Sequence, residues 1–211
     1  MYSPFTLAFK YLRYYITASN GKGHGVHSPF IFDFVTNVLT DDRYFQSYRE
    51  IENLRKELLL DKTVIQVEDF GAGSVSVKNK LTSANTDRRS IASIAKNAAK
   101  PKKFGRLLFR MVNYYQPATI LELGTSLGIS TSYLAAANPA AKVITMEGAS
   151  QVAKIAKQNF ETLELKNIEL TEGNFDDTLS SVIAGLPQVD FAFIDGNHRK
   201  EPTENYFNQL L

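Results

Sequence analysis

Four small residues near the middle of the chain could hold a ligand: Gly124 and Gly128, which stand four residues apart, with Thr125 and Ser126 between them. Glycine adopts positive φ angles and lets a ligand approach the backbone, so this pair is typical of a binding turn. Neither the GxGxxG pattern of dinucleotide sites nor the GK[ST] ending of a phosphate loop is present at this turn. Glu122, just before the first glycine, would repel a pyrophosphate but could hold a cationic amino group.

The flanking sequence predicts which elements position this turn. An apolar run from Thr119 to Leu123 ends at the first glycine, which indicates a strand that is buried on both faces. The segment from Ser130 to Ala137 is rich in helix formers. A strand, a glycine turn and a helix form the opening unit of a doubly wound α/β domain, in which ligands bind at the carboxyl ends of the strands.

Two later strands are predicted to end at carboxylates. Lys142–Met146 is followed by Glu147, about 20 residues past the glycine turn, where α/β nucleotide sites hold the two hydroxyls of a ribose. Val189–Ile194 is a fourth predicted strand and stops at Asp195. Both carboxylates should therefore reach the same edge of the sheet as the glycine turn.

A third predicted strand, Ile168–Leu170, lies between these two and leads to Asn174 and Phe175. An adenine could lie there, with the amide bonding its edge and the aromatic ring contacting its face. Helices are predicted over Gln151–Leu163 and Asp177–Ala184, so strands and helices alternate through this half of the chain.

The N-terminal part is predicted to be helical. Helices are predicted over Pro4–Thr17, Ile31–Leu39 and Tyr44–Leu60, and the first carries an aromatic face. We interpret that first helix as a packing helix, with a lid over a substrate or a dimer contact as the alternatives. We therefore predict a helical cap over residues 1–85 and a ligand-binding core over residues 86–211.

Two features of the N-terminal part resemble a metal site and a nucleotide-binding turn. His24 and His27 could ligate a metal, but without nearby carboxylates or cysteines a structural or substrate-facing role is favoured. The sequence DFGAGS at residues 69–74 imitates a nucleotide-binding turn. Residues 75–85 lack the apolar period of a helix that packs on a sheet, so a loop is predicted there.

Composition excludes several classes of protein. With 44% hydrophobic and 22% charged residues, the 211-residue chain is typical of folded globular proteins. It has no cysteine, which excludes disulfides, thiol catalysis and cysteine-ligated zinc and is compatible with a reducing cytoplasm. No signal peptide and no run of transmembrane length is found, so we expect a cytoplasmic protein without a membrane partner.

The stretch from residue 87 to residue 110 is strongly basic. Its charges are Arg88, Arg89, Lys96, Lys100, Lys102, Lys103, Arg106 and Arg110 against Asp87. A nucleic-acid-binding face is one interpretation. Because the whole chain carries a net charge of only +2 and aromatic residues are not interleaved before Phe104, a solvated helix face is favoured.

Four segments in register, ILELGTSLGIS, VITMEGAS, ELTEGNF and DFAFIDGNHRKEP, resemble the motifs of class I S-adenosylmethionine-dependent methyltransferases. The chain is most similar to small-molecule O-methyltransferases of the catechol and caffeoyl-CoA type and to related FIDG-x-H proteins. The resemblance covers about half of the chain, from Gly105 to Leu211. It implies a Rossmann-like, mainly parallel sheet behind a helical extension.

The resemblance also implies residue roles, with S-adenosylmethionine as the cofactor. Glu147 would bind the ribose, and Asn174 with Phe175 the adenine. The methionine part would lie on Gly124, Thr125, Ser126 and Ser130, and the implied cofactor set also includes Glu122, Gly128, Gly148 and Asp195.

Two residues after the fourth strand are the implied catalytic residues. Asp195 matches the aspartate that binds a divalent metal such as Mg²⁺ in metal-dependent members. His198 stands where those enzymes place a lysine base, and a histidine can accept the proton that a hydroxyl nucleophile must lose. A role for His198 at the entry of the next helix, with no catalytic part, is the alternative.

The chain also departs from the family pattern. Class I methyltransferases usually have seven strands, and the Asp-Asn pair that completes the metal site comes from a later strand. The sequence stops at Leu211, one helix past the fourth strand, which predicts that the fourth strand is a sheet edge. We expect either a truncated chain or a sheet completed by a partner, such as a second copy.

The sequence therefore predicts methyl transfer to an oxygen of a small acceptor, and three rivals stay open. A nucleic-acid methyltransferase would use the basic stretch. Its N6-adenine type usually carries Asp/Asn-Pro-Pro-Tyr after the fourth strand, where this chain has Asp195, Gly196, Asn197 and His198. A nicotinamide-dependent oxidoreductase would need GxGxxG at the central turn. A non-catalytic binding or assembly protein would bind the cofactor without turnover.

Overall fold

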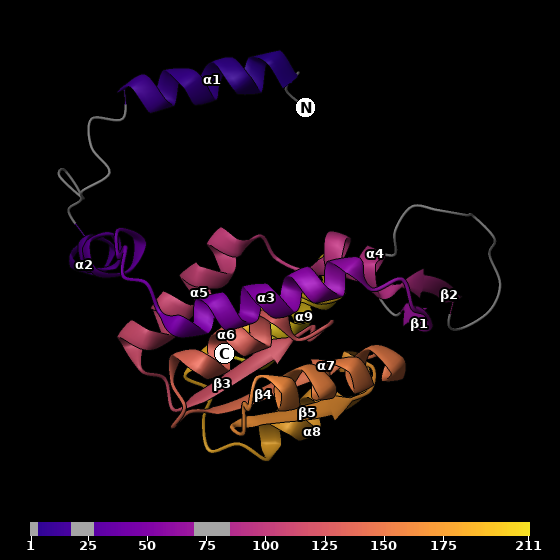
Figure 1. Cartoon of the computed structure of the whole chain (residues 1–211). Helices are drawn as coiled ribbons and strands as arrows, with labels where there is room; N and C mark the ends of the chain where they lie inside the picture. Colours follow the sequence, from indigo (N-terminus) through magenta and orange to yellow (C-terminus); the bar gives the residue numbers. More distant parts are fainter. Residues whose placement is uncertain (1–3, 18–27, 70–84) are drawn as a thin grey trace. The chain divides into compact units, whose positions relative to one another are not determined.

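The computed structural model describes residues 4–17, 28–69 and 85–211. The chain forms two compact units, Met1–Arg43 and Tyr44–Leu211 (Figure 1). The boundary predicted at residues 85 and 86 falls inside the second unit, because the helix and strand that precede it pack with the rest of that unit. The functional division into a cap and a cofactor-binding core stays a prediction. Residues 18–27, with His24 and His27, and residues 70–84, with most of DFGAGS and the predicted loop, lie outside the described residues.

The first unit is helical, as predicted. It contains α1 (Pro4–Thr17), α2 (Pro29–Phe34) and the short π-helix η1 (Val35–Leu39). Ser28 caps α2, because its hydroxyl oxygen accepts a hydrogen bond from the Ile31 amide at 3.4 Å. Proline follows in the first turn, where its missing N–H costs nothing.

The second unit begins with helices and an antiparallel strand pair. Its elements before the main sheet are α3 (Gln46–Leu60), β1 (Val64–Asp69), β2 (Asn85–Ser90), α4 (Ile91–Ala98) and α5 (Lys102–Tyr115). The buried stripe on α3 includes Ile51, Leu54 and Leu58. The β1–β2 pair differs from the prediction: residues 87–89, expected on a solvated helix face, form part of β2.

The main sheet confirms the predicted doubly wound α/β architecture. Its strands are β3 (Thr119–Leu123), β4 (Lys142–Glu147), β5 (Ile168–Glu172) and β6 (Phe191–Ile194). They pair in the order β5-β4-β3-β6, and each pair is parallel. The connecting and closing helices are α6 (Ile129–Ala137), α7 (Ser150–Thr162), α8 (Phe175–Ala184) and α9 (Lys200–Gln209). Because all four strands run the same way, their carboxyl ends meet at one edge.

Alternating side chains of β3 divide the core into two clusters. Ile120 belongs to a cluster with residues of α3 to α7, whereas Leu121 and Leu123 belong to a cluster with residues of α8 and α9. Figure 1 shows these helix groups on the two faces of the sheet. The second unit is thus a three-layer domain whose central strand is buried on both faces.

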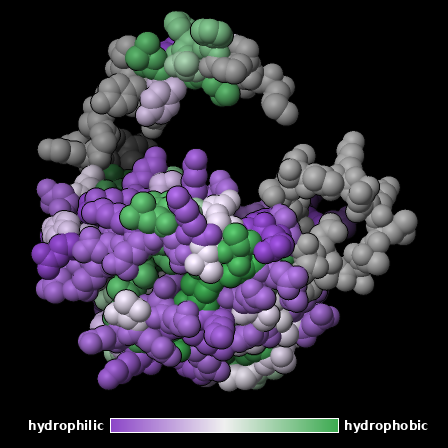
Figure 2. Space-filling view, turned by 45° about the vertical axis from the view of Figure 1, so that its right-hand side comes forward, coloured by the Kyte–Doolittle hydropathy of each residue, from purple (hydrophilic) through white to green (hydrophobic). Residues whose placement is uncertain are grey.

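Within the described part of the chain, β6 is an edge strand paired with β3 alone, as predicted. Completion of the sheet by a second copy stays a prediction. Hydrophilic residues cover most of the face shown in Figure 2, with hydrophobic residues in small groups. None of the helices that the structure describes is both long enough and apolar enough to cross a membrane.

The contact between α5 and α6 provides a test of this packing. A Cβ atom on Gly105 would overlap the ring of Tyr133, which is fully buried and donates a hydrogen bond to Glu52 at 2.8 Å. Gly105→Ala should therefore lower the free energy of unfolding by about 1–3 kcal/mol through overpacking. Gly185→Ala is the matched control, because a Cβ atom there meets only ordinary van der Waals contacts. Urea unfolding measures both, and equal effects of the two substitutions would contradict the packing described.

Candidate ligand site at the carboxyl edge of the sheet

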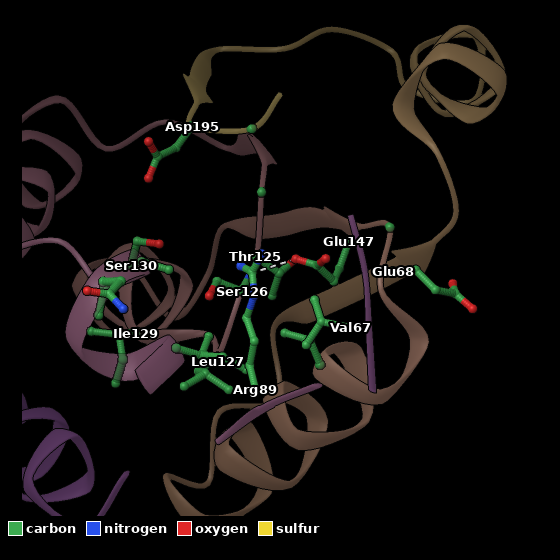
Figure 3. A pocket seen from close by; sticks show the side chains of 18 of the residues that line it. Val67, Glu68, Arg89, Thr125, Ser126, Leu127, Ile129, Ser130, Glu147 and Asp195 are labelled. Carbon is green, nitrogen blue, oxygen red and sulfur yellow. Dashed lines mark hydrogen bonds between the residues drawn. The ribbon is translucent and has the colours of Figure 1, made fainter. Parts of the chain in front are cut away.

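A cavity of about 760 Å³ opens at the carboxyl ends of β3, β4 and β6. Most of the predicted site residues line it. They are Gly124, Thr125, Ser126, Ser130, Glu147, Gly148, Asn174, Phe175, Asp195 and His198. Residues that lie up to 74 positions apart in the sequence are thus brought to one cavity by the parallel strand order (Figure 3).

The turn after β3 is held by its backbone. Gly124 and Thr125 both donate their amide hydrogens to the Met146 carbonyl at 3.0 Å, which fixes the turn against the end of β4. Gly124 has φ +104°, and a Cβ atom on it would lie 2.8 Å from the Asp195 carbonyl oxygen. Only glycine fits this position, because both the conformation and the space exclude a side chain.

Glu147 accepts two backbone hydrogen bonds at the end of β4. The Ser126 amide donates to one carboxylate oxygen at 2.8 Å (Figure 3), and the Ala149 amide donates to the other at 2.9 Å. Burial raises the pKa of Glu147, and these amides, with that of Gly148, oppose the rise. A carboxylate offers about four acceptor positions, so Glu147 keeps capacity for a hydroxyl donor of a ligand.

Glu122 lies beneath the turn and does not line the cavity, so the prediction that it contacts a ligand is not supported by its position. Thr131 and Thr145 donate to the same carboxylate oxygen, the latter at 2.7 Å. Because the single proton of Thr145 is used in this bond, Thr125 is the donor in its 2.6 Å contact with Thr145. Glu122 therefore supports the binding turn through two threonines.

Burial raises the pKa of Glu122 to about 7, although hydrogen bonds from Ser130, Thr131 and Thr145 oppose the rise. The nearby charge of Asp195 adds to it. The side chain is fully buried, so its ionised form is poorly solvated near neutral pH.

Gly128 also lies outside the cavity lining. Its φ is +79°, and a Cβ atom on it would overlap the ring of Phe160 on α7. This glycine lets α6 start close against α7, and its predicted part in the cofactor site stays a prediction.

Asn174 and Phe175 line the cavity with limited freedom. The Asn174 side chain caps α8 by accepting from the Asp176 amide at 3.3 Å. The Phe175 ring is 9% exposed, lies against Gly196 and makes an edge contact with Tyr206 at 6.0 Å between ring centroids. The Phe175 ring therefore has only a small area to offer a ligand.

Asp195 forms an ion pair that the sequence did not predict. Lys100 Nζ lies 2.6 Å from Asp195 Oδ1, and both residues line the cavity. Among the described residues there is no group of three or more His, Cys, Asp or Glu side chains that could hold a metal ion. The donor set around Asp195, a single carboxylate paired with an ammonium group, does not fit the predicted divalent metal.

The loop after Asp195 has an unusual backbone. Asn197 and His198 have φ +65° and +55°, and the His198 amide donates to the Gly196 carbonyl at 2.8 Å. The Asn197 amide group donates to the Tyr206 hydroxyl at 2.9 Å, which ties the loop to α9. His198 itself is exposed at the cavity wall. Non-glycine residues in this conformation carry strain, which is frequent at functional sites.

Part of the cavity wall was missed by sequence reasoning. It comes from β1, β2 and α4 and includes Val67, Glu68, Arg88, Arg89, Ser93 and Asn97. The alternation of apolar and polar residues from Ile65 to Glu68 is the signal that could have indicated β1. Figure 3 shows Val67 and Arg89 beside the glycine turn and Glu147.

The basic stretch is not one solvated face. Lys100 points into the cavity, Arg89 pairs with Asp87 at 3.0 Å, and the Arg106 guanidinium stacks 4.8 Å from the Tyr48 ring centroid. The charges of this stretch are thus distributed among different contacts.

Comparison with known proteins identifies relatives of this region. Residues 121–211 match a family model described as a methyltransferase domain. A catechol O-methyltransferase of Niastella koreensis is 32% identical over 110 residues, which cover 51% of this chain and 49% of the relative. The chain thus spans about half the length of the curated relative it matches.

Two solved structures share the fold. An O-methyltransferase from Bacillus cereus in complex with SAH has a TM-score of 0.53 at 21% identity, covering 86% of this chain and 66% of that chain. The O-methyltransferase TomG from Streptomyces achromogenes, in complex with SAM, has a TM-score of 0.53 at 20% identity, covering 80% and 60%. These structures confirm the predicted class I methyltransferase fold. The 32% identity with the Niastella koreensis protein confirms the resemblance to O-methyltransferases.

The buried position of Glu122 predicts a pH-dependent loss of stability. Between the ordinary pKa of 4.5 and the raised value of about 7, the unfolded chain releases a proton that the folded chain keeps. Stability therefore falls as pH rises through this window, and the loss above it is roughly 3 kcal/mol. Glu122→Gln cannot ionise and can still accept from both threonines.

We therefore expect Glu122→Gln to gain stability relative to the native chain by about this amount between about pH 4.5 and about pH 8. Urea unfolding of both proteins across the range measures the difference. A difference that does not change with pH would show that Glu122 ionises normally in the folded chain.

Proposed function

We propose that this protein binds S-adenosylmethionine in the cavity at the carboxyl edge of the sheet and transfers its methyl group to an oxygen of a small acceptor. The observation that carries the proposal is the arrangement of Glu147 beside the glycine turn. Two backbone amides orient its carboxylate at the end of β4, next to Gly124. This is the geometry in which α/β folds hold a ribose.

The cavity offers matching groups for each part of this cofactor. Glu147 accepts a hydrogen bond from the ribose, and the Asn174 and Phe175 side of the cavity takes the adenine. The methionine part lies over the turn, near Thr125, Ser126 and Ser130. These assignments follow the family motifs and the cavity lining together.

The cofactor supplies an electrophilic methyl group on a positively charged sulfur. The acceptor hydroxyl loses its proton, an oxygen lone pair forms the new O–C bond, and the C–S pair stays with sulfur, which becomes a neutral thioether. The protein contributes in-line positioning and exclusion of water. His198 at the cavity wall is the proposed recipient of the proton.

The proposed acceptor is a small hydroxylated molecule, the class named by the catechol O-methyltransferase relative. We place the reaction in the cytoplasm, since a chain without cysteine suits a reducing compartment. No step of the reaction is assigned to a metal ion, because the donor set at Asp195 does not fit one.

Calorimetric titration tests the cofactor. S-adenosylhomocysteine and S-adenosylmethionine should bind with micromolar affinity, and NAD should not bind. Glu147→Gln should weaken S-adenosylhomocysteine about tenfold or more, because it removes charge-assisted bonds to the ribose. Glu172→Gln is the matched control. Glu172 is the residue of β5 opposite Glu147 in the strand register, and it lies outside the cavity lining.

A ligand control separates ribose binding from damage to the turn. The native chain should prefer S-adenosylhomocysteine over its 2′-deoxy analogue, and Glu147→Gln should lose that preference. Equal binding of both ligands by the native chain would remove Glu147 from the ribose site. Tight NAD binding in place of S-adenosylhomocysteine would overturn the proposed function.

A further inference from the structure

The ion pair between Lys100 and Asp195 occupies the cavity beyond the glycine turn. Lys100 lies between α4 and α5, and its side chain is 35% exposed, whereas that of Asp195 is 14% exposed. We infer that Lys100 holds the acceptor oxygen as an anion in the cavity, in the role that a metal ion plays in metal-dependent methyltransferases. This inference rests on the proposed function.

Asp195 is a fixed anchor for the ammonium group. Its amide donates to the Leu123 carbonyl at 2.8 Å, and its own carbonyl lies against Gly124. The carboxylate therefore stays at one place relative to the glycine turn. Lys100 is held at this place by a short charge-assisted contact of 2.6 Å, which fixes the head of an otherwise flexible side chain.

The same contact explains why a divalent ion does not fit. An ammonium group at 2.6 Å from Oδ1 takes the position from which a metal would coordinate that oxygen and repels a second cation. Of the other carboxylates of the cavity lining, Glu68 lies on β1, Glu147 already binds two amides and Asp87 pairs with Arg89. No three His, Asp or Glu side chains of the described residues lie close enough together to hold a metal ion, which needs several oxygen ligands.

The chemistry of the acceptor follows from these groups. Methyl transfer is fastest from an oxyanion, and a nearby ammonium group stabilises that anion. A phenol has a pKa of about 10, near enough to neutrality for one cation and a histidine to favour its ionised form.

The surroundings of Lys100 suit an aromatic ring. Ile94, Ala98 and Ala99, which precede it on and after α4, line the same cavity with apolar groups. This part of the cavity thus has an apolar wall with the Lys100 ammonium group beside it. A phenolate has the matching shape, with an apolar ring and one anionic oxygen.

The test uses the full chain saturated with S-adenosylhomocysteine and two probes of similar size. The probes are 4-nitrophenol, at a pH where it is ionised, and the neutral 4-nitroanisole. The native complex should prefer the phenolate about tenfold, as expected for a hydrogen bond to a charged group. Lys100→Met should abolish the preference and Lys100→Arg should retain part of it.

Lys96→Met is the matched control. It removes one positive charge from α4, at an exposed residue outside the cavity lining, and should leave the preference unchanged. A loss of preference in Lys96→Met equal to that in Lys100→Met would mean that net charge alone determines it. A merely structural Lys100 would weaken both probes together and would also overturn the inference.

A second measurement addresses the metal directly. After treatment with a chelator, the native complex should show no saturable Mn²⁺ site by electron paramagnetic resonance. One Mn²⁺ per chain that Asp195→Asn abolishes would overturn the inference. Failure of S-adenosylhomocysteine to bind would overturn the proposed function, whereas its binding without phenolate preference would overturn the inference alone.

Discussion

The close approach of two strand ends at Gly124 is the constraint on which the site depends. β3 lies between β4 and β6, so the residue that follows it must accommodate the Met146 carbonyl on one side and the Asp195 backbone on the other. A side chain there would separate Glu147 from Asp195. The glycine thus sets the distance between the proposed ribose site and the proposed acceptor site.

Two carboxylates near this turn, Glu122 and Asp195, have different electrostatic environments. Glu122 supports the turn through Thr131 and Thr145, but its burial makes the ionised form unfavourable near neutral pH. Asp195 is instead neutralised by Lys100 within the cavity. Different carboxylates therefore serve the stability of the turn and the proposed ligand site: Glu122 lies beneath the turn, and Asp195 lines the cavity.

The sequence predicted the features that depend on local chemistry. The strand, glycine turn and helix around Gly124, and the carboxylate Glu147 at the next strand end, follow from short patterns with a known geometry. Lys100 and the β1–β2 pair could not be predicted in the same way. Lys100 is one of several similar cations in its stretch, and only the tertiary fold decides which of them turns toward Asp195. β1 meets its partner across residues 70–84, so its pairing has no local signature.

Hydrogen–deuterium exchange with and without S-adenosylhomocysteine tests the central claim most directly, that one cofactor site lies at the carboxyl ends of β3 and β4. Bound ligand orders the backbone that surrounds it and slows exchange there. The account predicts added protection at residues 124–130 and 147–149, with little change in α9. Protection confined to other segments, or none under saturating ligand, would contradict it.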